Sequence, residues 1–194
     1  MTSGMDPDVL DLLSGLLTRH SVGPRHVFAP GPNEVELQTA LRAAMRAPDH
    51  HGLRPYRFVT IGDERRDRLA GLFEEFARRL GKPDAEVRRE GERARNGPVL
   101  LAIVARIQAD HPQVPPHEQW MCAGGALTNF LSALHMMGYG AKVLSGRKAA
   151  DPAIGAAFCG EGETLVGWIV IGTPKSAPRP RAEDDVTLIV REWR

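Results

Sequence analysis

The sequence predicts a single α+β domain spanning residues 1–194. Two almost wholly apolar runs, residues 99–107 and 164–171, have the length and composition of buried strands. Two longer segments, Glu64 to Leu80 and His117 to Gly138, carry apolar residues at helical spacing. A compact fold of this length removes roughly 70% of the unfolded chain's surface from water, so we expect it to fold without disulfide or metal staples.

Start and stop signals delimit the remaining elements. Asp6-Pro7 places a capping carboxylate before a proline at the first helical position, and Asn33 can cap a second helix. Glycine at position 81 ends the helix that begins at Glu64. The predicted helices span residues 6–18, 34–46, 64–80, 82–95, 117–138 and 151–159, and the predicted strands span residues 57–61, 99–107, 141–144, 164–171 and 186–193.

Three segments carry more specific expectations. Charges of both signs alternate through residues 82–95, which is typical of a solvated surface helix or lid. Helix 117–138 is apolar nearly all round, so we expect it to lie in the core. The C-terminal extension, residues 175–194, joins a Pro/Arg-rich linker to a strand-like tail that needs a sheet edge to pair with, and that edge can belong to a second subunit.

Composition excludes several classes of protein. Lys+Arg 25 against Asp+Glu 24 gives a formal charge of +1, which implies neither a nucleic-acid footprint nor a polybasic membrane surface. Cys122 and Cys159 match no CxxC spacing and suit reduced thiols. No apolar run reaches 18 residues and the N-terminus lacks a signal-peptide pattern. We therefore expect a soluble, untargeted protein of the cytoplasm.

Common catalytic motifs are missing from the chain. Seven histidines are present, but His50 and His51 are adjacent and no HExxH motif or His/Cys quartet occurs, so no metal site is predicted. The chain has no GxSxG elbow, P-loop or GxGxxG after a strand. Hydrolase, NTPase and dinucleotide-fold functions therefore lack their usual sequence signals.

Residues 46–56 form the most polar junction in the chain, where a predicted helix gives way to a predicted strand. The segment contains arginines, adjacent histidines, a carboxylate and two prolines, and it suits ligand binding better than core packing. Arg19, His20 and Ser21 follow the first helix and offer a guanidinium, an imidazole and a hydroxyl suited to a phosphate. The alternative is that Arg19 only stabilises the helix dipole. Arg179 and Arg181 can bring further positive charge to the same ligand.

Taken in order along the chain, these segments resemble the nitroreductase-like FMN-dependent oxidoreductase family, and its short YdjA-like subgroup most closely. The resemblance runs from about Leu10 to Pro174, and its most specific part is Arg-Ala-Pro-Asp-His at residues 46–50. The other matching pieces are residues 19–21, 54–56, 118–119, 138–140, 145–146 and 167–174. The resemblance implies a mixed, mainly antiparallel sheet flanked by helices, in a homodimer that exchanges C-terminal strands and binds two FMN molecules at its interface.

The resemblance also assigns residues to the cofactor and the reductant. Arg19, His20 and Ser21 occupy the place of a family Arg-Arg-Ser at the FMN phosphate and ribityl chain. Arg46 and His50 are implied to reach the flavin of the other subunit, and Arg25 is assigned to the flavin N1/O2 edge. Three further FMN contacts are implied at Val143, Leu144 and Ser145. The implied NAD(P)H contacts are Ala133, Leu134, His135, Met136, Met137 and Gly138.

The implied activity is ping-pong hydride transfer from NAD(P)H through FMN to a nitroaromatic, quinone or similar acceptor. The flavin carries this chemistry, so no catalytic side chain is assigned. His20 and Leu144 stand where the family has arginines, and Arg54 and Tyr56 stand where Gln and Trp are common. Because two arginines are lost, a non-catalytic flavin-binding or flavin-sequestering protein on the same scaffold is the alternative, and a specialised oxidation or dehalogenation is a third possibility.

Overall fold

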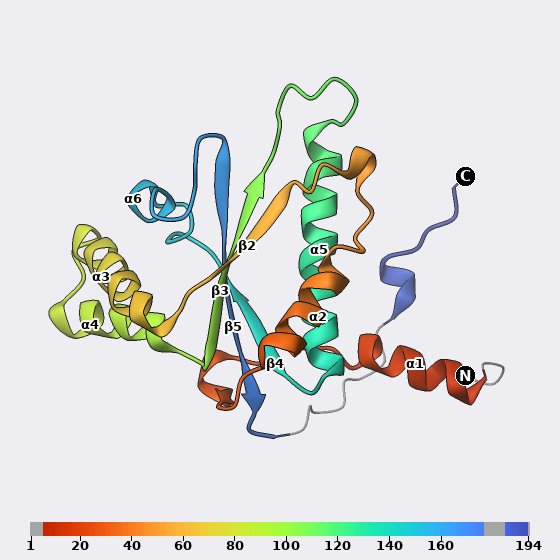
Figure 1. Cartoon of the computed structure of the whole chain (residues 1–194), viewed down its shortest axis with the longest axis horizontal. Coiled ribbons are helices and arrows are strands. Elements are labelled where there is room, and N and C mark those ends of the chain that lie inside the picture. Colours follow the sequence, from red (N-terminus) through yellow and green to blue (C-terminus); the bar gives the residue numbers. More distant parts are fainter. Residues whose placement is uncertain (1–5, 177–184, 194) are drawn as a thin grey trace.

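The computed structural model describes residues 6–176 and 185–193 of the chain. A five-stranded sheet runs through the centre in the order β1-β5-β3-β2, with β4 also paired to β5 (Figure 1). Every strand pair in these two ranges is antiparallel. Helices cover both faces of the sheet, which confirms the expected α+β fold with a mainly antiparallel sheet.

Two long strands form the centre of the sheet. β3 (Val99–Arg106) and β5 (Glu163–Pro174) pair along most of their length, from Val99 opposite Ile171 to Arg106 opposite Glu163. β2 (Tyr56–Thr60) lies on the other side of β3. The buried apolar run of β3 places it at the centre, as its composition predicts.

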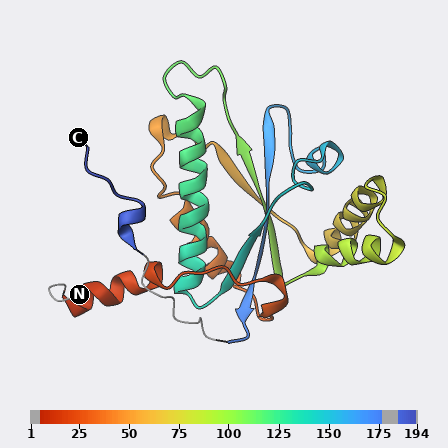
Figure 2. The same cartoon turned by 180° about the vertical axis from the view of Figure 1, so that it is seen from behind.

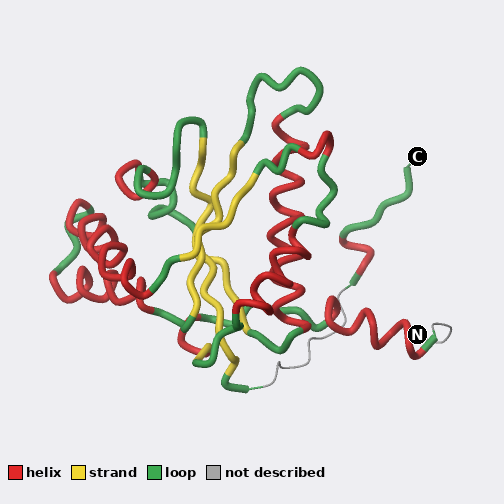
Figure 3. The backbone as a smooth tube through the Cα atoms, viewed as in Figure 1, coloured by secondary structure: helices red, strands yellow, loops and turns green. Residues whose placement is uncertain are grey.

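Two shorter strands also pair with β5, as the tube in Figure 3 shows. β4 (Gly140–Leu144) pairs with residues 168–172 of β5, and β1 (Val27–Phe28) pairs with residues 173–174. The pairing of β3 with β5 shifts register between Ile103 and Val104, next to Gly167. Gly167 has φ +156°, and a Cβ there would lie 2.4 Å from the Leu144 carbonyl oxygen. Glycine is therefore required for β4 to approach β5 at this point.

One face of the sheet is covered by α2 (Glu34–Ala44) and α5 (Pro116–Met136). Small residues let these two helices approach closely: Ala40 and Ala44 on α2 and Ala123 and Ala126 on α5 are all buried. Asn33 caps α2 with a full capping box. The Asn33 side chain accepts a hydrogen bond from the Glu36 N–H, and the Glu36 carboxylate accepts one from the Asn33 backbone N–H.

The opposite face is covered by α3 (Asp63–Arg79), α4 (Asp84–Glu92) and the short α6 (Pro152–Gly155), as the reverse view in Figure 2 also shows. Phe73 of α3 meets Trp168 of β5 edge to face, with ring centroids 4.9 Å apart. Arg66 of α3 is only 5% exposed and donates to the carbonyls of residues 94, 96 and 98, which anchors the chain after α4. None of the described helices is both long and apolar enough to cross a membrane.

Three expectations need correction. The tail predicted as a strand over residues 186–193 contains a 3-10 turn at Val186–Leu188 and pairs with no described strand of this chain, while its expected pairing with a second subunit stays a prediction. Helix α5 is not buried all round, since Trp120, Met121 and Met136 are 43%, 72% and 52% exposed. The predicted helix 151–159 shortens to the four residues of α6. The short strand β1 was not predicted, because two residues show no periodicity.

Candidate functional site

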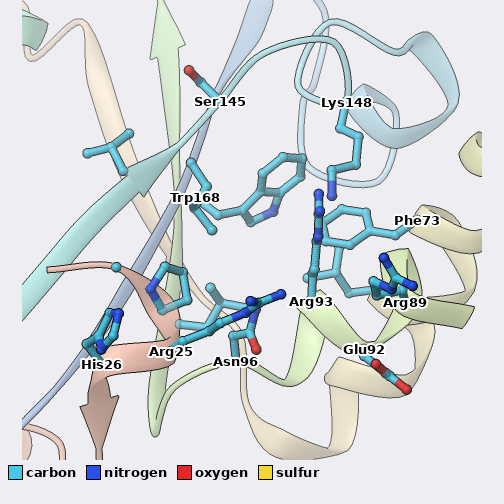
Figure 4. Close-up of a pocket in the computed structure, with 16 residues that line it drawn as sticks. Arg25, His26, Phe73, Arg89, Glu92, Arg93, Asn96, Ser145, Lys148 and Trp168 are labelled. Carbon is cyan, nitrogen blue, oxygen red and sulfur yellow. The ribbon is translucent and has the colours of Figure 1, made fainter. Parts of the chain in front are cut away.

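A cavity of about 560 Å³ lies on the α3/α4 side of the sheet (Figure 4). Its size falls within the range of small-molecule sites. It is lined by Gly23, Pro24, Arg25, His26, Leu69, Phe73, Arg89, Glu92, Arg93, Asn96, Leu100, Val143, Leu144, Ser145, Lys148 and Trp168. Five segments that are distant in sequence therefore meet at one site.

Four residues that the resemblance assigns to FMN lie together in this cavity. Val143 and Leu144 end β4, and Ser145 follows directly. Arg25 comes from the 3-10 turn Pro24–His26, which precedes β1. Gly167 determines how closely this end of β4 approaches β5, because the Leu144 carbonyl oxygen lies where a Cβ at position 167 would be.

Aromatic and aliphatic side chains form the back of the cavity. Trp168 is 3% exposed and packs between Phe73 and Phe158, and Leu69 and Leu100 complete the apolar surface. The indole Nε1 of Trp168 has no hydrogen-bond partner among the described residues. Buried donors are nearly always paired, so an unpaired one against a cavity is a sign that a polar ligand belongs nearby.

Positive charge gathers at the same end of the cavity. Arg89 and Arg93 come from the α4 region and Lys148 from the loop after β4, and Figure 4 shows Arg93 and Lys148 beside Trp168. Residues 82–95 are therefore more than a solvated surface helix, because one side of this segment lines the cavity and Val87 and Glu90 are buried.

Glu90 forms ion pairs with two members of this cluster, Arg93 and Lys148, and with Lys82. Its carboxylate lies 2.9 Å from Lys148 Nζ, 3.1 Å from Lys82 Nζ and 3.0 Å from Arg93 Nη1. Burial raises the pKa of Glu90, but the hydrogen bonds from Lys148 and Lys82 outweigh it and leave the pKa below its ordinary value. Burial lowers the pKa of Lys148, against the effect of Glu90.

Arg19, His20 and Ser21 lie outside this cavity, next to the end of α5. The Thr18 hydroxyl is 3.0 Å from His135 Nε2, and the rings of His20 and His135 meet edge to face at 5.7 Å. Burial, together with the neighbouring His20 and Arg19, lowers the pKa of His135. The next residue, Val22, donates its N–H to the Ala141 carbonyl, which ties this segment to the start of β4.

The segment assigned to NAD(P)H, residues 133–138, is the C-terminal turn of α5. His135 is the member that lies beside His20, and Met136 is exposed. Leu134 is fully buried in the core and Ala133 is partly buried, so these two side chains contribute packing. Gly138 has φ +89° and the next N–H, that of Tyr139, returns to the Leu134 carbonyl, which is a glycine helix end.

Residues 46–56 form a separate corner on the α5 side of the sheet. Asp49 accepts from the N–H groups of Leu53 and Arg54, and burial together with Asp49 raises the pKa of Cys122 to about 11. The Tyr56 hydroxyl donates to the Ala44 carbonyl. Asp49 and Tyr56 therefore fix the path of the chain from α2 to β2.

His50 projects from this corner with its Nδ1 2.7 Å from Glu118 Oε2, while Arg46 is exposed. The neighbour Gln119 is 1% exposed and bonds to the backbone of Gln108 and Val114, so it fixes the proline-rich loop before α5. Within one chain the structure thus places the predicted FMN residues in three locations: the cavity, the end of α1 and this corner. Arg179 and Arg181 lie outside the described residues.

Trp168, Lys148, Arg89 and Arg93 are cavity residues that the sequence did not single out. The spacing of Arg89 and Arg93, four residues apart, puts them on one helical face and is a signal that could have been used. Lys148 and Trp168 reach the cavity only through the pairing of β4 with β5, which no local pattern reveals. No group of three or more His, Cys, Asp or Glu side chains within residues 6–176 and 185–193 is arranged to hold a metal ion.

Comparison with known proteins identifies the fold and the family. Residues 16–173 match the model of the nitroreductase family. The chain is 33% identical over 167 residues to the Escherichia coli K12 protein named "Putative NAD(P)H nitroreductase YdjA", which covers 86% of this chain and 90% of the relative.

The chain belongs to the nitroreductase family.

Solved structures of family members share this architecture. The nitroreductase-like protein of Bacillus cereus superposes with a TM-score of 0.72 at 20% identity, covering 100% of this chain and 98% of that one. A nitroreductase-type protein of Desulfovibrio desulfuricans, described in complex with FMN, has a TM-score of 0.67 at 22% identity, with 97% and 98% covered. Family membership supports an oxidoreductase in general terms.

Proposed function

We propose that the protein is an FMN-dependent NAD(P)H oxidoreductase that reduces a nitroaromatic, quinone or similar acceptor in a ping-pong reaction. The observation that carries this proposal is the cavity in which Arg25 and residues 143–145 meet an apolar wall. Family membership adds support, as do the relative named for NAD(P)H and the related fold described with FMN.

The residues present fit a flavin. Trp168, Phe73 and Leu100 supply apolar surface for a flat ring system, and the unpaired indole N–H of Trp168 can serve a ring carbonyl or nitrogen. Ser145 and the backbone at the end of β4 supply polar groups along one wall. Bound FMN supplies the two-electron chemistry, accepting hydride from NAD(P)H and passing it to the acceptor.

The protein contributes position and charge. Arg19, with His20 and Ser21, binds the FMN phosphate through charge-assisted hydrogen bonds. Arg25 stabilises negative charge that develops at the flavin N1/O2 edge. The end of α5 around His135 and Met136 contacts the nicotinamide nucleotide, which leaves before the acceptor enters.

A homodimer brings the separate parts of the site together. Leu16 and Leu17 of α1 and Met121 of α5 are 52%, 69% and 72% exposed, and Trp193 of the tail is 99% exposed. Apolar surface of this extent is typical of a protein interface. In the dimer, Arg46 and His50 reach the flavin of the partner, and the described part of the C-terminal extension, residues 185–193, packs on the partner.

The role of Arg19 is tested by comparing FMN with riboflavin, which lacks the phosphate. We expect Arg19→Ala to weaken FMN affinity by at least about fivefold and to leave riboflavin affinity within about twofold, because one charge-assisted bond is lost. The matched control is Arg68→Ala, an exposed arginine of α3 outside the cavity lining. Equal FMN retention by the wild type and Arg19→Ala would remove Arg19 from the site.

The alternative function, flavin binding without turnover, is motivated by His20 and Leu144 standing where the family has arginines. Anaerobic mixing with NADH and with NADPH separates the two functions. Loss of the flavin absorption band supports the oxidoreductase, and a band that persists supports the binder.

A further inference from the structure

The cation-lined end of the cavity carries more positive charge than its own carboxylates balance. Arg25, Arg89, Arg93 and Lys148 line it, and Glu92 is the only carboxylate among the described lining residues. Figure 4 shows the side chains of Arg25, Arg93 and Lys148 directed toward the space beside Trp168. A concave site lined by one sign of charge concentrates ligands of the opposite sign.

Glu90 does not neutralise the excess. This single buried carboxylate is shared by Lys82, Arg93 and Lys148, and of these three only Lys82 has a second carboxylate nearby among the described residues, that of Glu86 at 3.9 Å. Arg25 and Arg89 have no ion-pair partner among the residues that the structure describes. Two guanidinium groups thus remain to serve a ligand.

A further observation points to a ligand in this cavity. The Trp168 Nε1 donor is buried and unpaired, in a residue that is only 3% exposed. Lys148 Nζ lies 4.0 Å from the centroid of the Phe73 ring and is already paired with Glu90 at 2.9 Å, so this observation rests on the indole alone. Leaving a buried donor unpaired costs free energy that a bound polar ligand can offset.

We propose that Arg89, Arg93 and Lys148 form an anion-binding subsite beside Arg25, and that the acceptor reduced in this cavity is an aromatic molecule bearing a carboxylate. The planar guanidinium groups suit a carboxylate, which they can bind with two parallel hydrogen bonds. Leu69 of α3, which also lines the cavity, adds apolar surface for the aromatic ring next to it. This inference rests on the proposed function for the identity of the cavity as the reaction site.

An anion in this cavity has a second possible source, the phosphate of FMN. The two sources predict different behaviour. A carboxylate subsite binds benzoate whether or not flavin is present, whereas a phosphate site binds FMN more tightly than riboflavin and is blocked for benzoate once FMN is bound.

Isothermal titration of the purified protein with benzoate and with benzamide tests the subsite directly, since neither probe can be reduced. We expect the wild type to bind benzoate at least about tenfold more tightly than benzamide, because charge-assisted bonds favour the anion. Arg89→Gln and Lys148→Met should each weaken benzoate binding at least about fivefold and change benzamide binding less than about twofold.

The matched control is Arg88→Gln. Arg88 directly precedes Arg89 in α4, is exposed and lies outside the cavity lining, so this variant removes the same charge away from the subsite. It should change neither affinity by more than about twofold. Equal binding of benzoate and benzamide, or equal losses in Arg88→Gln and Arg89→Gln, would overturn the subsite. Loss of FMN affinity without loss of riboflavin affinity in Arg89→Gln would assign the cations to the cofactor phosphate and also overturn it.

The same samples keep the two proposals separate. Flavin content is read from the absorption spectrum, and benzoate binding is measured with and without added FMN. A protein that takes up no flavin but discriminates benzoate from benzamide contradicts the oxidoreductase and retains the anion subsite. A reducible flavoprotein that binds benzoate and benzamide equally supports the oxidoreductase and contradicts the anion subsite.

Discussion

Asp49 shows how one residue can define a corner of this protein. Its carboxylate accepts hydrogen bonds from two backbone N–H groups, those of Leu53 and Arg54, and adds to the burial that raises the pKa of Cys122 to about 11. The sequence marked this junction as a ligand site because of its polar density. Much of that density proves to be structural, since Asp49 and Tyr56 bond within the chain. Arg46 is exposed, and His50 is exposed while paired with Glu118, and these two side chains are the ones that the proposed function directs to a partner.

A second structural pair, Arg57 with Glu163, predicts a specific pH dependence of stability. Arg57 Nε donates to Glu163 Oε1 at 2.8 Å, and Arg57 together with the Gly160 N–H lowers the pKa of Glu163 to about 2 from 4.5. Because the folded-state pKa lies below the unfolded one, this pair stabilises the fold fully above about pH 4.5 and loses its effect as the pH falls toward 2.

Glu163→Gln should therefore lower the free energy of unfolding at pH 7 by about 1–3 kcal/mol. The difference from the wild type should shrink as urea unfolding is repeated at lower pH, from about 4.5 downward. A difference that stays constant down to the lowest pH at which the protein folds would contradict the assigned pKa.

At the scale of elements, the sequence predicted what local patterns encode. The apolar runs of β3 and β5 and the periodic helices α2, α3 and α5 appear close to their expected bounds. The tail did not form the expected strand, because a strand depends on a neighbour and not only on its own residues. The cavity could not be predicted from the sequence for the same reason, since Lys148 and Trp168 meet Arg89 and Arg93 only after the sheet forms.

The contact of β4 with β5 depends on Gly167. Gly167→Ala places a Cβ 2.4 Å from the Leu144 carbonyl oxygen at a φ of +156°, so β4 must shift. We expect a loss of about 2 kcal/mol or more in unfolding free energy, together with weaker flavin binding, because Leu144 and Ser145 move with the strand.

The control for this substitution is Gly71→Ala in α3, where a Cβ meets nothing within 4 Å. Alanine in a helix interior is favoured over glycine by about 0.5–1 kcal/mol, so this variant should be more stable than the wild type. Stability changes of the same sign in both variants would show that the close approach of Leu144 is not the cause.

At the scale of the whole molecule, the proposed function requires residues that a single chain does not bring together. The residues assigned to FMN lie in three places, and the exposed apolar residues of α1, α5 and the tail lie on the side of the sheet away from α3 and α4 (Figure 1). We propose that a second copy covers this side and buries these apolar residues. In the proposed dimer, this copy would also bring its Arg46 and His50 to the partner.

Met121→Asp tests this arrangement, because it places a charge on the 72% exposed side chain of α5. We expect the variant to sediment as a monomer at micromolar concentration and to lose bound FMN. Arg88→Asp on α4, on the other side of the sheet, should remain dimeric. A Met121→Asp protein that keeps both its dimer and its flavin would place the interface elsewhere.

The most direct test of the central claim is an anaerobic titration of the purified protein with NADH or NADPH, followed by a nitroaromatic acceptor, while the flavin absorption band is monitored. The account predicts a yellow protein whose band bleaches with about one equivalent of reductant per flavin and returns when the acceptor is added. A protein that binds no FMN, or whose bound flavin is not bleached by either nucleotide, would contradict it.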